Sequence, residues 1–297
     1  MSISVIKDIR KIYSSLNADE IRGSAYRDLN VGLMASSEEI YREMEEYLAP
    51  AFMDEGARTE ALKSIHRVDG SPTSRFDFVL CEAGIPVPSN GHTFHPDDTA
   101  SVAHAIVSGH HDLEIAVARR FPLLRKAVSD KVIHRVAREN ALFALVTALP
   151  NVIPSVLDLP WAVGEFATDT AFLTMNQVRM ALLLAAVHGR PVGYSEQKAQ
   201  IAVIVAGAFG WRALARELVG KIPLGGGLIP KAAVAFAGTF VVGLGLEKVN
   251  RTGIGMSRAE RKDAYADAFA RGREIVHQLS PAITLQSRGG GDATPID

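Results

Sequence analysis

The sequence ALFALVTALPNVIPSVLDLPWAVGEFATDTAFLTMNQVRMALLLAAVHG, residues 141–189, opens the stretch that decides the fold, and this stretch continues to Lys248. Charged residues are sparser here than in the chain as a whole, of which 22% is charged. We expect four or five helices in the stretch, among them 161–188, 200–220 and 232–248. A helix that is apolar on nearly all sides is either deeply buried or faces lipid.

The length of the apolar runs leaves open whether these helices cross a membrane. A membrane-spanning helix needs about 20 mainly apolar residues, whereas 201–211 is too short and 232–246 is marginal. The run 172–187 is interrupted by polar residues, and an arginine at mid-bilayer costs about 2.5–3.5 kcal/mol. Buried polar groups must find partners, so four residues are candidates for a ligand site or an internal hydrogen-bond network: Asp169, Asn176, Gln177 and Arg179.

Two of the expected helices carry small residues at every fourth position, a spacing that lets helix backbones approach closely. Such stripes also occur in Ala-rich soluble helices. They therefore predict either a homo-oligomer built through these faces or ordinary packing inside one chain. The stripes are Ala202, Ala206 and Gly210 in the first helix, and Ala235, Thr239 and Gly243 in the second.

The segment that joins these two helices is basic. Basic residues at that place suit contact with anionic lipid headgroups on the cytoplasmic side of a membrane, and they suit an ordinary solvated turn as well. The candidates for headgroup contact are Arg212, Arg216, Lys221 and Lys231.

Composition narrows the class of protein. A length of 297 residues predicts two domains, and a formal net charge of −1 gives no excess that would point to nucleic acid. The single cysteine, Cys81, excludes an intramolecular disulfide and indicates a reducing compartment. Residues 1–27 begin with apolar positions at helical spacing and interleaved charges, which predicts an amphipathic helix and not a signal peptide.

Residues 28–115 have the pattern of a small α/β domain, with apolar runs at 29–34, 64–68 and 76–81 as candidate strands. Ser36 or Ser37 can cap a helix after the first strand. A phosphate-binding loop at this place would need G-x-x-x-x-G-K-[ST], but residues 34–40 contain neither glycine nor lysine, and no N-K-x-D string occurs. We therefore predict that this α/β domain lacks a P-loop, takes no cofactor and catalyses no reaction, so that a GTPase ancestor, if it had one, has lost its phosphate-binding machinery.

The histidines between residues 92 and 111 raise the question of a metal. His92 and His95 have the His-x-x-His spacing that can bind Zn²⁺ together with a carboxylate. However, residues 92–98 have the composition of a loop, and His110 and His111 suit a helix C-terminus, where imidazole is favoured. We predict no metal site, with His92 and His95 as the candidates that a metal would need. A metal-dependent hydrolase is the least favoured function.

A series of short strings follows in order: Phe121-Pro122, RENA (138–141), ALP (148–150), IP (153–154), DTAFLTMNQ (169–177), AAVHG (185–189), KIP (221–223) and GGG (225–227). The series resembles the DUF697 family over residues 115–250. That family is an uncharacterised helical module found in proteins assigned to the inner membrane and attached to Era-like GTPase domains. The resemblance implies a membrane-associated helical domain preceded by a relic of a GTPase domain, and it supplies no active site.

The C-terminal part completes the predicted organisation. Ser257 and Glu260 have capping-box spacing, which predicts an amphipathic helix over 257–280 that ends at Pro281, followed by a flexible tail over 286–297. We predict an α+β or mostly α fold: a degenerate α/β domain at 28–115, then a hydrophobic α-helical bundle at 116–250.

The favoured function is a non-catalytic binding or scaffold protein on the cytoplasmic side of a bacterial inner membrane, with a membrane lipid or membrane protein as its partner and no nucleic acid. The alternative is a soluble, cytoplasmic regulatory or nucleotide-sensing protein whose apolar helices form a closed core.

Overall fold

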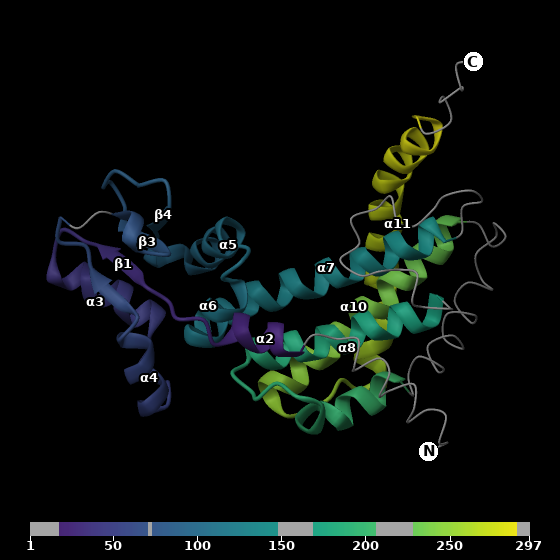
Figure 1. Cartoon of the computed structure of the whole chain (residues 1–297), viewed down its shortest axis with the longest axis horizontal. Coiled ribbons are helices and arrows are strands. Elements are labelled where there is room, and N and C mark those ends of the chain that lie inside the picture. The colour runs from purple at the N-terminus through teal and green to yellow at the C-terminus, as the bar shows by residue number, and fades with distance from the viewer. Residues whose placement is uncertain (1–17, 71–72, 148–168, 206–227, 290–297) are drawn as a thin grey trace, which may run out of the picture. The chain divides into compact units, whose positions relative to one another are not determined.

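The computed structural model describes residues 18–70, 73–147, 169–205 and 228–289 (Figure 1). These residues are mostly helical and contain one four-stranded parallel sheet, which confirms the predicted class at this level. The chain divides into two compact units. The first, here called the α/β unit, holds the described residues up to Lys131 together with Leu183–Val192. The second, the helical unit, holds the other described residues. Residues 116–131 thus group with the sheet, whereas the sequence analysis assigned them to the helical domain.

The sheet of the α/β unit has the order β2-β1-β3-β4. All its pairings are parallel, with Val31 opposite both Ile65 and Phe78, and Val79 opposite Gly91. The two central strands are almost entirely buried, as their uninterrupted apolar sequences predict. The elements in chain order are α2 (Ala18–Ala25), β1 (Val31–Met34), α3 (Glu38–Leu48), α4 (Glu55–Leu62), β2 (Ile65–Arg67), η1 (Thr73–Arg75), β3 (Phe78–Glu82), β4 (Gly91–Phe94), η2 (Pro96–Asp98), α5 (Thr99–Gly109) and α6 (Glu114–Arg120).

One strand was missed by sequence reasoning. His92 lies in β4, where the composition of residues 92–98 predicted a loop. The strand forms because its backbone continues the ladder of β3, with the Val79 N–H donating to the Asn90 carbonyl at 3.0 Å. Backbone pairing of this kind leaves no mark in the side-chain pattern. The buried Cys81 thiol, by contrast, lies where the apolar run placed it.

Local sequence signals set several helix ends. The Ser37 hydroxyl caps α3 by accepting from the Ile40 N–H at 3.2 Å. Helix α6 ends just before Pro122, because proline has no N–H to donate to the preceding turn. Pro122 then begins η3 (Pro122–Leu124), which leads into α7 (Arg125–Val146). Gly189, at φ 73°, ends α8 in the left-handed conformation that glycine adopts without strain.

The helical unit contains α7 from Val132 on, most of α8 (Asp169–Val187), the described helical residues 194–205, α10 (Leu228–Thr252) and α11 (Arg258–Gly289). Two glycines mark close helix approaches. A Cβ at Gly243 would lie 2.8 Å from Ile133 in α7 and 3.1 Å from Met180 in α8. One at Gly272 of α11 would lie 3.1 Å from the Ala233 carbonyl oxygen of α10. The stripe formed by Ala235, Thr239 and Gly243 is buried in this packing.

The C-terminal helix begins as predicted and ends later. The Ser257 N–H donates to Glu260 at 2.7 Å and the Glu260 N–H to the Ser257 hydroxyl at 3.2 Å, which is a complete capping box. The prediction that Pro281 ends the helix was wrong, since α11 continues to Gly289. Pro281 removes the donor to the carbonyl of His277, but His277 is exposed, so water can take that donor's place.

Candidate functional site

A cluster of uncharged polar side chains is buried where α7, α8 and α10 meet. Its members, here called the amide cluster, are Asn140, Asn176, Gln177 and Thr239, each at most 3% exposed. The Asn176 amide donates to Asn140 Oδ1 at 2.9 Å, and the Asn140 amide donates to Thr239 Oγ1 at 2.8 Å. The Gln177 amide donates to the same hydroxyl at 3.3 Å, and the Asn140 amide also lies 3.3 Å from the Leu173 carbonyl oxygen.

The amide cluster links three helices by hydrogen bonds that fix their register. Asn140 is the central member, since it both accepts and donates within the cluster. The Oδ1 atom of Asn176 is buried and has no hydrogen-bond partner, and leaving such an acceptor unpaired costs about 1–3 kcal/mol. None of the four side chains ionises near neutral pH or is an activated nucleophile. The arrangement therefore suits binding and positioning rather than covalent or acid–base catalysis.

An ion pair joins α7 and α8, two of the helices that carry the amide cluster. The Arg179 guanidinium donates to Glu139 at 3.0 Å, and the two side chains are 14% and 15% exposed. Glu139 precedes Asn140 and Arg179 follows Gln177 by two positions, so the ion pair joins two of the helices that also carry the amide cluster. The charge of Arg179 is thus compensated inside the chain, as expected for a cation on an otherwise apolar helix.

The other predicted site residues are only partly described. Asp169 is the first residue of α8, and its side chain lies outside the described residues. Three of the predicted headgroup contacts, Arg212, Arg216 and Lys221, also lie outside them. Lys231 is exposed in the first turn of α10. The structure thus brings Asn176 and Gln177 together in one cluster, adds Asn140 and Thr239 to it, and pairs Arg179 separately with Glu139.

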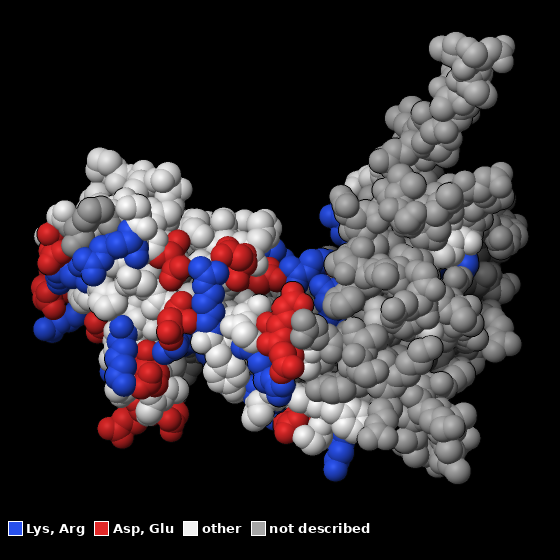
Figure 2. Space-filling model, viewed as in Figure 1, with Lys and Arg blue, Asp and Glu red and all other residues white. Residues whose placement is uncertain are grey.

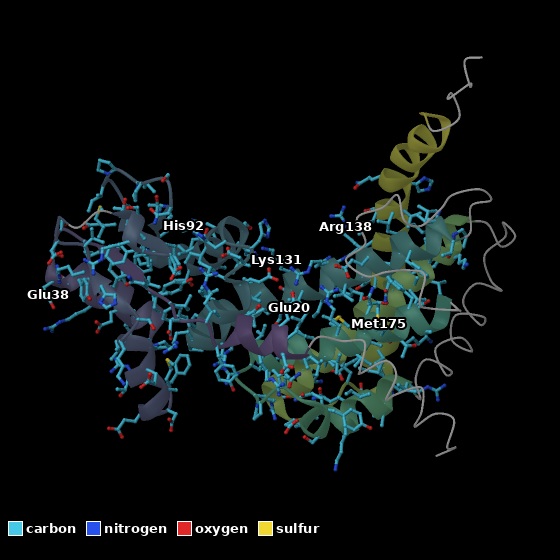
Figure 3. All side chains as sticks on the ribbon, in the orientation of Figure 1. Glu20, Glu38, His92, Lys131, Arg138 and Met175 are labelled. Carbon is cyan, nitrogen blue, oxygen red and sulfur yellow. The ribbon has the colours of Figure 1, made fainter. Side chains whose placement is uncertain are left out.

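A second place of interest is the edge of the sheet where β1 and β3 end. In parallel sheets of this kind, ligands bind outside the carboxyl ends of the central strands. Here the Ser36 N–H donates to Glu82 Oε2 at 2.6 Å, and the hydrogen bonds from Ser36 hold the pKa of Glu82 below its usual value. Glu38, labelled in Figure 3, opens α3 and is paired with Arg67 at 2.5 Å. Carboxylates therefore lie where a phosphate would need N–H donors.

The histidine candidates separate in the structure. His92 Nε2 lies 3.0 Å from His110 Nε2, whereas His95 is exposed and precedes η2. Sequence reasoning could not find this pair, because it depends on how β4 packs against α5. Within the described residues, no group of three or more His, Cys, Asp or Glu side chains is arranged to hold a metal ion.

Surface charge shows no single-sign patch on the part of the α/β unit visible in Figure 2, where blue and red side chains alternate. Several charges of the α/β unit form exposed pairs, such as Lys63 with Glu60 and Arg42 with Glu38. A nucleic-acid surface would need clustered basic residues.

No protein family, curated protein or solved structure matches the chain. The DUF697 resemblance of residues 115–250 therefore stays a prediction.

Proposed function

We propose that the protein is a non-catalytic binding or scaffold protein that attaches to a membrane through its helical unit, on the cytoplasmic side of a bacterial-type inner membrane. One observation carries the proposal. Among the described residues, the segment Pro230–Thr252 of α10 is long and apolar enough to cross a membrane. Thr239, near the middle of this segment, is paired inside the chain with Asn140 and Gln177, as polar groups in membrane helices are.

The half-buried positions in the middle of α10 are apolar. Val241, Val242 and Leu244 are partly exposed, while Thr239 and Gly243 are buried against other helices. A helix whose central threonine is buried and whose partly exposed central positions are valine and leucine is suited to contact lipid chains or an apolar surface of a membrane protein. The partner class is thus a membrane lipid or a membrane protein.

A second candidate is a soluble regulatory protein whose helices form a closed core. It is favoured by the burial of 61% of the apolar window of α10 within the chain, since the core helix of a soluble protein has the same composition. The shorter apolar helix Ala171–Val187 also falls below the length of a membrane span.

For the α/β unit we propose a degenerate relative of GTPase domains, as the DUF697 resemblance implies. The parallel order β2-β1-β3-β4 with its central β1 and β3 supports a doubly wound ancestry. The Glu82 carboxylate, bonded to the Ser36 N–H, supports the loss of phosphate binding. We expect no binding of GTP or GDP by the purified full chain in calorimetric titration, and binding at micromolar nucleotide would contradict this part.

Membrane fractionation tests the leading proposal. Membranes from cells that express the full chain are washed with high salt and then with alkaline carbonate, and the chain is followed by immunoblot. We expect it to stay in the membrane pellet. In the variant Val242→Lys, a charge on the half-buried side of α10 should release a large share into the soluble fraction.

The matched control is Ala266→Lys, which places the same charge on an exposed position of α11 and should leave the distribution unchanged. Circular dichroism checks that both variants keep the helical content of the parent. If the parent chain is soluble and monodisperse without detergent, the membrane proposal fails and the closed-core protein is the correct class.

A further inference from the structure

The turn between α10 and α11 presents an apolar side chain to solvent. Ile254 lies between Gly253 and Gly255 and is 68% exposed. A single exposed isoleucine is common on soluble proteins, so the surroundings of Ile254 decide whether it has a role.

The turn that carries Ile254 is held by its own hydrogen bonds. Gly253, at φ 76°, follows the last residue of α10, and its N–H donates to the Val249 carbonyl at 2.8 Å. The Thr252 hydroxyl accepts from the Ile254 N–H at 3.2 Å and donates to the Lys248 carbonyl at 2.7 Å. The backbone of the turn therefore holds Ile254 in an exposed position.

Three basic side chains follow in the first two turns of α11: Arg258, Arg261 and Lys262. All three are exposed, and within the described part of the chain none of them forms an ion pair. The neighbouring Lys248 differs, because it pairs with Glu260 at 2.6 Å.

These three cations are unfavourable for α11 itself. The N-terminal end of a helix favours negative charge, and Arg258 and Lys262, four positions apart, repel each other. Glu260 is already engaged in the capping box and in its ion pair with Lys248. Residues 251–263 hold four basic and only two acidic side chains. Their excess positive charge is therefore available to an anionic partner outside the chain.

We propose that residues 251–262 are a contact site for an anionic lipid surface. Ile254 enters the boundary between headgroups and acyl chains, and the three cations of α11 contact lipid phosphates. This role rests on the membrane attachment proposed above and specifies its lipid class and the residues that meet it. A lipid surface suits the turn because it offers apolar and anionic contacts side by side. The contact does not require α10 to cross the bilayer.

Flotation of the full-length chain with vesicles tests the proposal. The vesicles are phosphatidylcholine alone or phosphatidylcholine mixed with phosphatidylglycerol, each at physiological and at high salt. We expect tighter binding to the anionic vesicles, and high salt should weaken it.

Variants of the turn should weaken binding to the anionic vesicles. Each cation near an anionic surface strengthens binding about fivefold, so the double variant Arg258→Gln with Lys262→Gln should bind roughly 25-fold more weakly. Ile254→Gln should bind about tenfold more weakly, because it loses the partition of an isoleucine side chain out of water. All three positions are exposed, so circular dichroism should show the helical content of the parent.

The matched control is the double variant Arg271→Gln with Arg273→Gln, which removes the same charge from exposed positions of α11. Arg271 lies nine positions after Lys262, which is about 14 Å along a helix. Charges are screened over about 8 Å at physiological salt, so this control should bind as the parent does.

Three results would overturn the proposal: equal or absent binding of the parent to neutral and anionic vesicles, equal effects of the two double variants, or an Ile254→Gln variant that binds as the parent does. Retention of the parent in the carbonate-washed pellet would in each case still support attachment through α10. Conversely, a chain that carbonate releases, but that binds anionic vesicles through Ile254 and Arg258, has the lipid contact site without an inserted α10.

Discussion

At the scale of single residues, Asn140 is the side chain on which the amide cluster depends. Asn140→Leu removes the oxygen that accepts from the Asn176 amide and the amide that donates to the Thr239 hydroxyl. It should lower the free energy of unfolding by about 1–3 kcal/mol, the cost of buried polar groups left unpaired. Urea denaturation followed by circular dichroism measures the loss.

The double variant Asn140→Leu with Asn176→Leu removes the orphaned amide as well as its partner. The double variant should lose less free energy of unfolding than the sum of the losses in the two single variants, because the effects of substitutions within one hydrogen-bond network are not additive. Gln278→Leu, at an exposed position of α11, is the control and should change little. An Asn140→Leu variant as stable as its parent would show that the hydrogen bonds of the amide cluster do not stabilise the fold.

His92 predicts a dependence of stability on pH. Its pKa in the folded chain is lowered to about 4, mainly by burial, from an unfolded value of about 6.5. The unfolded chain therefore binds more protons between these values, and stability falls as the pH drops from about 6.5 towards 4. Because the ring is half exposed, we expect only about 1 kcal/mol from this residue after solvent screening.

Urea midpoints at pH 7.5, 6 and 5 measure this effect. His92→Gln, which keeps a polar side chain that does not titrate, should show a smaller loss over the same range than the parent chain. The control is His66→Gln, at an exposed position of β2. Equal pH dependence of the parent and His92→Gln would be inconsistent with a neutral His92 in the folded chain.

At the scale of elements, α10 contains a matched pair of glycines that differ only in their surroundings. Gly243→Ala places a Cβ 2.8 Å from the branched Ile133 side chain, and overpacking of this kind costs about 1–3 kcal/mol. Gly245→Ala meets nothing closer than 3.9 Å and should gain up to about 1 kcal/mol from helix propensity. Thermal unfolding should therefore move in opposite directions for the two variants, and a common direction would mean that Gly243 is not a packing contact.

The elements also show what the sequence can and cannot predict. Ser37 predicts the start of α3, Gly189 predicts the end of α8, and the Ser257 capping box predicts the start of α11. Each of these signals lies within a few residues of the helix terminus that it sets. The pairings inside the candidate sites do not. Asn140 and Thr239 are 99 positions apart, and His92 and His110 are 18 apart. Such pairs are decided by how helices and strands pack, which no local pattern records.

Asn176 and Gln177 are an intermediate case. Their position on an apolar helix predicted that they must find partners, and both do. Asn140 carried a similar signal, since it is an amide directly before the apolar run that begins at Ala141. Thr239 did not, because a threonine in a stripe of small residues is equally consistent with close packing alone.

At the scale of the whole molecule, charge balance sets how the protein behaves in solution. The chain has 32 basic and 33 acidic residues, a formal net charge of −1 and nine histidines. Proteins with a net charge near zero self-associate most readily. We therefore expect detergent-free self-association, measured by sedimentation velocity at low salt, to be greatest near pH 7 and to decrease at pH 6, where protonation of histidines adds positive charge.

This expectation affects the fractionation experiment, because a precipitate of a nearly neutral chain would pellet together with membranes. At about pH 11 lysines lose their charge, the chain becomes strongly anionic, and a precipitate held by weak association should dissolve. A helix inserted through its apolar residues has no reason to leave the bilayer at that pH, since its attachment does not depend on charge. Retention in the pellet after carbonate, with self-association that peaks near neutral pH, would support insertion of α10. Release by carbonate together with the same peak would identify self-association as the cause of pelleting and support the closed core.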